Sequence, residues 1–289
     1  MLDEHYRYLE AIQNRRDYIE DQIQAGSPVV GLVYNDGILI LTVTSGQKIY
    51  EVYNHLALSA IGHTADVERL RLLVTDAASV QGFQSSVDDV TLHRLTHFVL
   101  CPPIKQSFES IFNAPTIAKI LMVELGPPHQ LVAINYDGTT RTSQNAEVIG
   151  GTDRVERTMR NYIGQTDIRL GDELTLKQAF ELALLTWAVG RTTSSATEYG
   201  FSLDPDRGES DQTSEAEDFS TDELISFVQA ELEESLVEAS ILQISKRSKS
   251  KFRRLTADEV EDMTPLDSDK AQNNKWVSAF LGLKPSLAV

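Results

Sequence analysis

The chain has 289 residues, 41% of them hydrophobic, which is enough apolar side chain for a folded core and excludes a wholly disordered protein. Its 43 acidic and 26 basic residues give a net charge of −17, which argues against nucleic acid or an anionic membrane surface as the main partner. The single cysteine, Cys101, excludes an intrachain disulfide, and no segment has the ~18 to 20 apolar residues of a membrane span. A soluble cytoplasmic protein is expected.

The first predicted element is an N-terminal helix. Residues 3–24 place apolar side chains at roughly helical spacing among charges, and Gly26 would end the helix. Strand-like runs follow, and Asp36-Gly37 between the first two is typical of a tight hairpin turn. Two strand pairs are therefore expected: 28–34 with 38–43, and 48–52 with 55–61.

The middle of the chain alternates between helical and strand patterns. One helix is expected from Thr64, capped by Thr64 or Asp66, and a second from about Asp88. Because Pro102 and Pro103 fall inside the second stretch, it must kink, break or be two helices. Three strands and then two helices are predicted beyond it: strands 116–125, 130–140 and 146–151, and helices 152–163 and 174–189.

The last third of the chain carries most of the negative charge. Thirteen acids and one base lie between Asp204 and Glu238. Residues 192–220 lack apolar periodicity, so they are expected to be disordered, with a candidate acidic helix near 222–234. Beyond them we expect a final hairpin, a helix starting at Thr256, and a polar tail with an apolar cluster around Trp276.

The order of these elements predicts the fold class. Strands joined by tight hairpins and separated by pairs of helices indicate α+β rather than a wound parallel sheet. The natural packing is two antiparallel sheets face to face, each covered by a pair of helices.

Several stretches, in this order, resemble α-type subunits of the proteasome core particle, of the short bacterial style. They are SPVVGLVYNDGILILTV, QKIYEVYNHLALSAIGHTADVERLRLL, VIGGTDRVERTMRNYI, KQAFELALLTWAVG and VEASILQISKRSKSKFRRLTADEVEDM. The resemblance implies the four-layer αββα sandwich of N-terminal-nucleophile hydrolases. It also implies a division of the chain: 1–26 as leading helix and gate segment, 27–191 with 236–263 as one domain, 192–235 as an acidic, disordered insertion, and 264–289 as a C-terminal tail.

The resemblance implies a function without catalysis. Such α-type subunits form outer rings that gate the pore, so we expect a homoheptamer stacked on a ring of β-type subunits. It would admit unfolded protein substrates, dock a ring-shaped ATPase or another activator, and need no cofactor or metal. Lys48 matches the lysine that pairs with the C-terminal carboxylate of an activator, and Gly62 and His63 match the turn lining the same pocket. The simpler alternatives are a solvated lysine and a turn that needs glycine.

An enzymatic alternative places a nucleophile at Ser27. Peptidases of this fold use a hydroxyl on a free α-amino terminus, and the resemblance puts that position on Ser27, supported by Lys48. Val43 and Gly150 stand where catalytic members carry a carboxylate and a serine, and Pro28 restricts the backbone of Ser27. The sequence therefore favours a non-catalytic subunit over a self-processing peptidase or amidase.

Three other patterns have simpler interpretations. His93, His97 and Cys101 would share a helix face at zinc-ligand spacing, but no Glu stands between them in catalytic register, so core or interface side chains are expected. The Gly150-Gly151-Thr152-Asp153 turn lacks the lysine of a nucleotide-binding loop. Six bases over 246–254 lack an aromatic ladder, which favours a solvated hairpin over a nucleic-acid patch.

Overall fold

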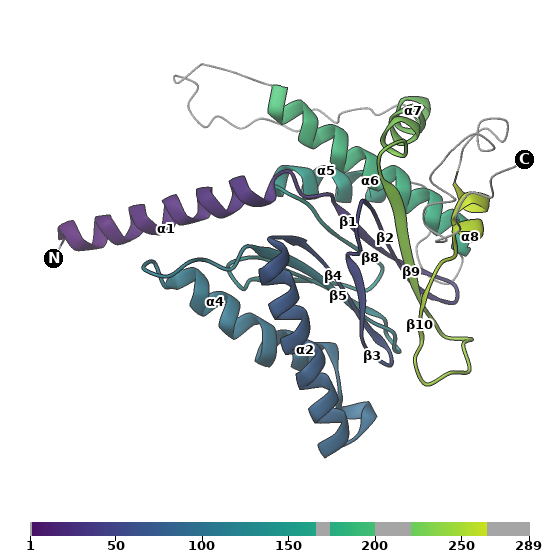
Figure 1. Cartoon of the computed structure of the whole chain (residues 1–289), viewed down its shortest axis with the longest axis horizontal. Coiled ribbons are helices and arrows are strands. Elements are labelled where there is room, and N and C mark those ends of the chain that lie inside the picture. Colours follow the sequence, from purple (N-terminus) through teal and green to yellow (C-terminus); the bar gives the residue numbers. More distant parts are fainter. Residues whose placement is uncertain (1, 166–173, 200–220, 265–289) are drawn as a thin grey trace, which may run out of the picture.

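The computed structural model describes residues 2–165, 174–199 and 221–264. Within them, two five-stranded antiparallel sheets pack face to face, as Figure 1 shows. The first sheet has the order β10-β9-β2-β1-β8 and the second β3-β4-β5-β6-β7. The strands of the first sheet are β1 (Val29–Tyr34), β2 (Gly37–Thr44), β8 (Ala146–Ile149), β9 (Leu236–Gln243) and β10 (Phe252–Arg254). Those of the second are β3 (Ile49–Tyr53), β4 (Leu56–Gly62), β5 (Ala118–Glu124), β6 (Gln130–Ile134) and β7 (Thr140–Ser143).

Helices cover the outer face of each sheet (Figure 1). Over the first sheet lie α5 (Asp153–Gln165), α6 (Leu176–Tyr199), α7 (Thr221–Glu231) and α8 (Ala257–Met263). Over the second lie α2 (Thr64–Gln84), the short turns η1 (Val87–Asp89) and α3 (Leu92–Arg94), the π-helical turn η2 (Leu95–Leu100) and α4 (Cys101–Glu109). The leading helix α1 (Leu2–Ile23) extends away from the sandwich at its N-terminal end and meets it at the end preceding β1. None of the helices in the described ranges combines the length and apolar character needed to cross a bilayer.

Alternation along the strands explains the layers. Val30 and Leu32 of β1 pack in the cluster beneath α5 to α8, whereas Val29 and Val33 pack in the cluster between the two sheets. Because successive side chains of a strand point to opposite faces, a strand buried on both sides has a continuous apolar sequence. The result is a four-layer αββα sandwich, which confirms the predicted fold class.

The predicted hairpins are present, and one strand was missed. The Asp36-Gly37 turn joins β1 to β2, and a Cβ on Gly37, whose φ is 147°, would lie 1.8 Å from the carbonyl oxygen of Leu242. The sequence predicted three strands between 116 and 149, but there are four. The additional strand is β7, whose sequence TRTS has exposed and half-buried side chains, so it has no apolar pattern to reveal it.

The starts of α2 and α4 add detail that the sequence did not predict. The side chain of His63, rather than that of Thr64 or Asp66, caps α2 by accepting a hydrogen bond from the backbone N–H of Ala65. The Pro102-Pro103 pair lies in the first turn of α4, directly after the π-helical turn. The prolines follow the point where the Cys101 N–H donates five residues back, to the Thr96 carbonyl, so their missing N–H groups coincide with a change of helical winding.

The structure corrects the predicted boundary of the acidic insertion. Helix α6 continues to Tyr199, beyond the predicted start of the insertion at residue 192, and α7 lies where the acidic helix was predicted. Leu224, Val228 and Leu232 are each 1% exposed and belong to the core over the first sheet. Three apolar side chains four residues apart bury enough surface to offset the entropy of ordering an otherwise acidic helix. Residues 200–220, and the Trp276 cluster in 265–289, lie outside the described residues.

Candidate functional site

The candidate nucleophile and the candidate activator-pocket residues lie at one end of the two sheets. Ser27 precedes β1, Lys48 precedes β3, and Gly62 ends β4. The loop between α1 and β1 lies against this end of β4, since a Cβ built on Gly26 would be 3.4 Å from the Cβ of Ile61. Segments far apart in the sequence therefore form one surface at this end.

The Ser27 hydroxyl is engaged in hydrogen bonds within the fold. It donates to the backbone carbonyl of Val43 (2.6 Å) and accepts from Nε1 of Trp187 (2.9 Å). Trp187 comes from α6 and is completely buried, so its indole N–H requires an acceptor. The nitrogen of Ser27 is a peptide nitrogen, joined through Gly26 to α1. Neither a carbonyl oxygen nor a peptide nitrogen can serve as the general base that a nucleophilic hydroxyl needs.

Val43 and Gly150, which stand where catalytic members carry a carboxylate and a serine, are both closely packed. Val43 is 2% exposed and belongs to the core over the first sheet. A Cβ on Gly150 would lie 2.8 Å from Cγ1 of Val155, so a serine there would require the Val155 side chain to move. The apolar core around Val43 therefore disfavours a carboxylate, and the contact with Val155 disfavours a serine at position 150.

Glu238 holds Lys48 in place, and sequence reasoning missed it. The carboxylate of Glu238, on β9, accepts hydrogen bonds from the backbone N–H groups of Lys48 (2.6 Å) and Ile49 (3.1 Å). One carboxylate thus ties the first sheet to the start of β3 in the second. An acid in the apolar strand sequence LVEASILQ was the available signal, because a buried carboxylate needs hydrogen-bond donors.

The ammonium of Lys48 is half-buried and makes no ion pair within the described part of the chain. Burial lowers the pKa of Lys48 to about 8, while the charge of Glu238 acts to raise it and that of Arg191 to lower it. Burial also raises the pKa of Glu238, and the hydrogen bonds from Lys48 and Ile49 oppose that effect. At neutral pH Lys48 is still mostly protonated, so it can attract a carboxylate.

Gly62 and His63 have structural roles that account for their presence. Gly62 has a φ of 134°, and a Cβ there would lie 2.1 Å from the carbonyl oxygen of Ile117, so the turn needs glycine. His63 is exposed and caps α2 through Nδ1, 3.3 Å from the Ala65 nitrogen. Their role in an activator pocket stays a prediction.

The histidine and cysteine pattern does not form a ligand cluster. The rings of His93 and His97 lie 4.6 Å apart, but η2 is wound as a π-helix, so the spacing of an α-helical face does not apply as far as Cys101. Burial raises the pKa of the Cys101 thiol to about 11, which disfavours the thiolate that binds metal. Within the described ranges no three His, Cys, Asp or Glu side chains are grouped to hold a metal ion.

The bases near the final hairpin hold the hairpin together. Lys246 and Lys251 donate from Nζ to backbone carbonyls of the same loop. Arg253 forms an ion pair with Glu259 of α8 at 2.7 Å. At least three of the six bases are thus occupied within the fold.

Several curated proteins are similar to this chain. No protein-family model matches the chain. It is 28% identical over 159 residues to "Proteasome subunit alpha" of Thermomonospora curvata, covering 52% of this chain and 67% of the relative. It is 30% identical over 149 residues to the protein of that name from Actinosynnema mirum, covering 48% and 55%. A third relative of that name, from Kineococcus radiotolerans, is 26% identical over 183 residues, covering 60% and 72%. The chain thus spans about half to three quarters of these relatives, and its resemblance to bacterial proteasome α-type subunits is confirmed.

Proposed function

We propose that this chain is a non-catalytic α-type subunit of a bacterial proteasome core particle. It would form the outer homoheptameric ring, stack on a ring of β-type subunits that supply the proteolysis, and control the entry of unfolded proteins in the cytoplasm. The relatives named proteasome subunit alpha, and the αββα sandwich preceded by a long helix, support this proposal.

The observation that carries the proposal is the arrangement at Ser27. Helix α1 precedes β1, and the Ser27 hydroxyl is hydrogen-bonded to the carbonyl of Val43 and the indole N–H of Trp187. A sandwich whose first strand is continuous with a helix can use that helix to line or close a pore, and while the helix stays attached the Ser27 nitrogen is a peptide nitrogen that cannot act as a base. This arrangement supports the gating role over the self-processing peptidase.

Activator docking would use Lys48. A half-buried ammonium without an internal ion pair is suited to the terminal carboxylate of an inserted peptide tail, because partial burial strengthens the attraction. The backbone of Lys48 is already fixed by Glu238, so little ordering would be needed when a tail binds.

The test is a Lys48→Ala substitution in the full chain, assembled with a β-type subunit. The rate of unfolded-protein degradation is measured with and without a ring-shaped ATPase, alongside the ATPase-independent hydrolysis of a short peptide. We expect Lys48→Ala to abolish most of the stimulation and to leave peptide hydrolysis unchanged.

Lys177→Ala is the matched control. Lys177 is an exposed lysine at the start of α6. It lies near Leu174, whose carbonyl accepts a hydrogen bond from Asn35 just after β1. Because Ser27 lies before β1, Lys177 is at the opposite end of the sandwich from Ser27 and Lys48. Equal stimulation of the Lys48→Ala and Lys177→Ala particles would refute the docking role.

A further inference from the structure

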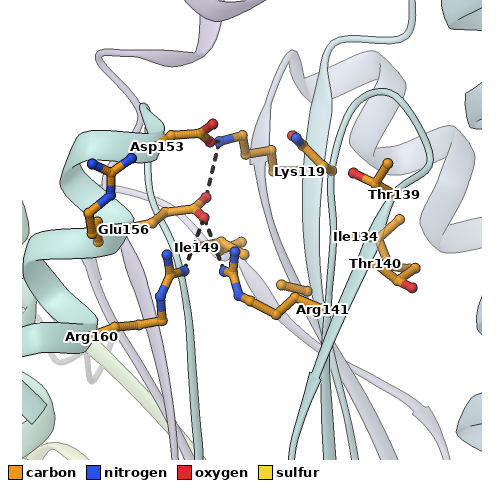
Figure 2. Close-up of a pocket in the computed structure, with 12 residues that line it drawn as sticks. Lys119, Ile134, Thr139, Thr140, Arg141, Ile149, Asp153, Glu156 and Arg160 are labelled. Atoms are coloured by element: carbon orange, nitrogen blue, oxygen red, sulfur yellow. Dashed lines mark hydrogen bonds and ion pairs between the residues drawn. The ribbon is translucent and has the colours of Figure 1, made fainter. Parts of the chain in front are cut away.

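A polar pocket of about 300 Å³ opens at the β7 and β8 edge of the sandwich (Figure 2). Figure 2 shows α5 forming one wall, with β5, β7 and the turn after β6 across from it. The charged side chains that line it are Lys119, Arg141, Asp153, Glu156, Arg157 and Arg160. The lining thus has four cations and two carboxylates, the opposite balance to a chain with a net charge of −17.

The base of the pocket is a buried ion network. Glu156 is 6% exposed and lies 3.0 Å from Nζ of Lys119 and 3.0 Å from Nη2 of Arg141. Arg141 also pairs with Glu147, which is 2% exposed, at 2.9 Å. Lys119 is 3% exposed, and the exposed Asp153 approaches it only to 3.7 Å. These charges offset one another, so they hold α5 against β5 and β7 rather than serving as free ligands.

Two arginines of α5 line the pocket beside this network, and only one of them is paired with a carboxylate of the network. Arg157 is exposed, lines the pocket, and makes no ion pair with any side chain in the described part of the protein. Nη1 of Arg160 is buried without a hydrogen-bond acceptor among the described residues, and its distance of 3.6 Å from Glu156 exceeds hydrogen-bond length. A buried guanidinium nitrogen without an acceptor is unfavourable unless an additional oxygen is bound.

The facing wall supplies neutral donors. Thr140, at the start of β7, carries a hydroxyl, and Asn135, after β6, carries an amide whose oxygen accepts from the Tyr136 N–H, which leaves its NH₂ group to donate. Guanidinium groups on one wall and neutral donors on the other can contact several oxygens of one anion. A phosphate group presents such oxygens in several directions, whereas a carboxylate has two in one plane.

We propose that this pocket binds the phosphate group of a small ligand, with Arg157 and Arg160 as its main contacts. Both arginines lie one turn apart on one face of α5, so they can contact the same anion. Lys119 and Arg141 are paired with carboxylates at the base of the pocket, so the attraction for the anion comes from Arg157 and Arg160.

The test is titration calorimetry of the purified full chain with inorganic phosphate at pH 7.5 and constant ionic strength. We expect saturable binding by the natural sequence, and binding about tenfold weaker in Arg157→Gln and in Arg160→Gln, since each loses a charged hydrogen-bond donor. Acetate under the same conditions should bind much more weakly than phosphate.

Arg154→Gln is the matched control, because Arg154 is an exposed arginine on the same helix that does not line the pocket. It carries the same change of charge and should retain binding. Absence of saturable phosphate binding, equal affinity of the Arg157→Gln and Arg154→Gln proteins, or acetate binding as tightly as phosphate would each overturn the proposal. Because the assay needs neither a β-type subunit nor an activator, its outcome is independent of the proposed function.

Discussion

At the scale of single residues, Glu238 and Lys48 form a coupled pair. Glu238 fixes the backbone of Lys48 through a 2.6 Å hydrogen bond, and its charge acts against the lowering of the Lys48 pKa by burial. With that pKa at about 8, Lys48 is charged at neutral pH and loses its charge as the pH rises above 8. A docking role for Lys48 would therefore depend on pH near the physiological range.

We predict that activator stimulation falls as the pH rises through about 8, because neutral Lys48 no longer attracts a carboxylate. Glu238→Gln removes the charge that raises the Lys48 pKa, so the fall should shift to lower pH. The measurement is the ratio of stimulated to basal degradation between pH 6.5 and 9. Lys48→Arg is the control, since a guanidinium stays charged throughout and should flatten the profile. An identical midpoint in the natural and Glu238→Gln particles would contradict the coupling.

At the scale of elements, α7 shows how a small apolar stripe can order an acidic segment. Leu224 and Val228 are buried beside α6, and the ring of Phe227 lies 6.3 Å from that of Trp187, whose indole N–H holds Ser27. The helix thus helps to enclose the tryptophan that engages the Ser27 hydroxyl.

Leu224→Ala should lower the free energy of unfolding by about 2 to 4 kcal/mol, because it leaves a cavity beneath α7. Urea denaturation followed by circular dichroism measures this difference. Glu223→Ala is the neighbouring control; its side chain is exposed, so its effect should stay within about 0.5 kcal/mol. Equal stability of the two variants would show that α7 does not pack as described.

At the scale of the whole molecule, the outer surface of α2 carries large apolar side chains. Phe83 is 91% exposed, Val80 52% and Leu72 46%. A cluster of this kind on one surface helix is unusual for a protein that acts alone and is typical of a contact with another subunit. This surface supports the proposal that the chain assembles into a larger particle.

Phe83→Glu should leave the isolated chain folded, since the ring is almost fully exposed, and reduce the fraction found in large assemblies. Sedimentation velocity of the chain mixed with a β-type subunit measures that fraction. Gln84→Glu places the same charge on the adjacent exposed residue and should assemble normally. If both variants assemble equally well, the surface around Phe83 is not an interface.

Most of the helices and strands could be predicted from the amino-acid sequence, because their signals are local. Alternating or continuous apolar residues predict strands, and Asp36-Gly37 favours the turn that joins β1 to β2. The order of these elements then led to the sandwich. The polar strand β7 was not predictable in this way, since its pairing with β6 rests on backbone hydrogen bonds that its side chains do not signal.

Which polar groups contact one another could not be predicted from the sequence and follows from the packing of the fold. Glu238 reaches Lys48 across 190 residues, and Trp187 reaches Ser27 across 160. Likewise, Lys119 on β5 and Arg141 on β7 share the carboxylate of Glu156 on α5. A charged or hydroxyl side chain has many chemically suitable partners in a sequence of this length. The packing of the two sheets and their helices selects among them, because burial makes each such contact either necessary or costly.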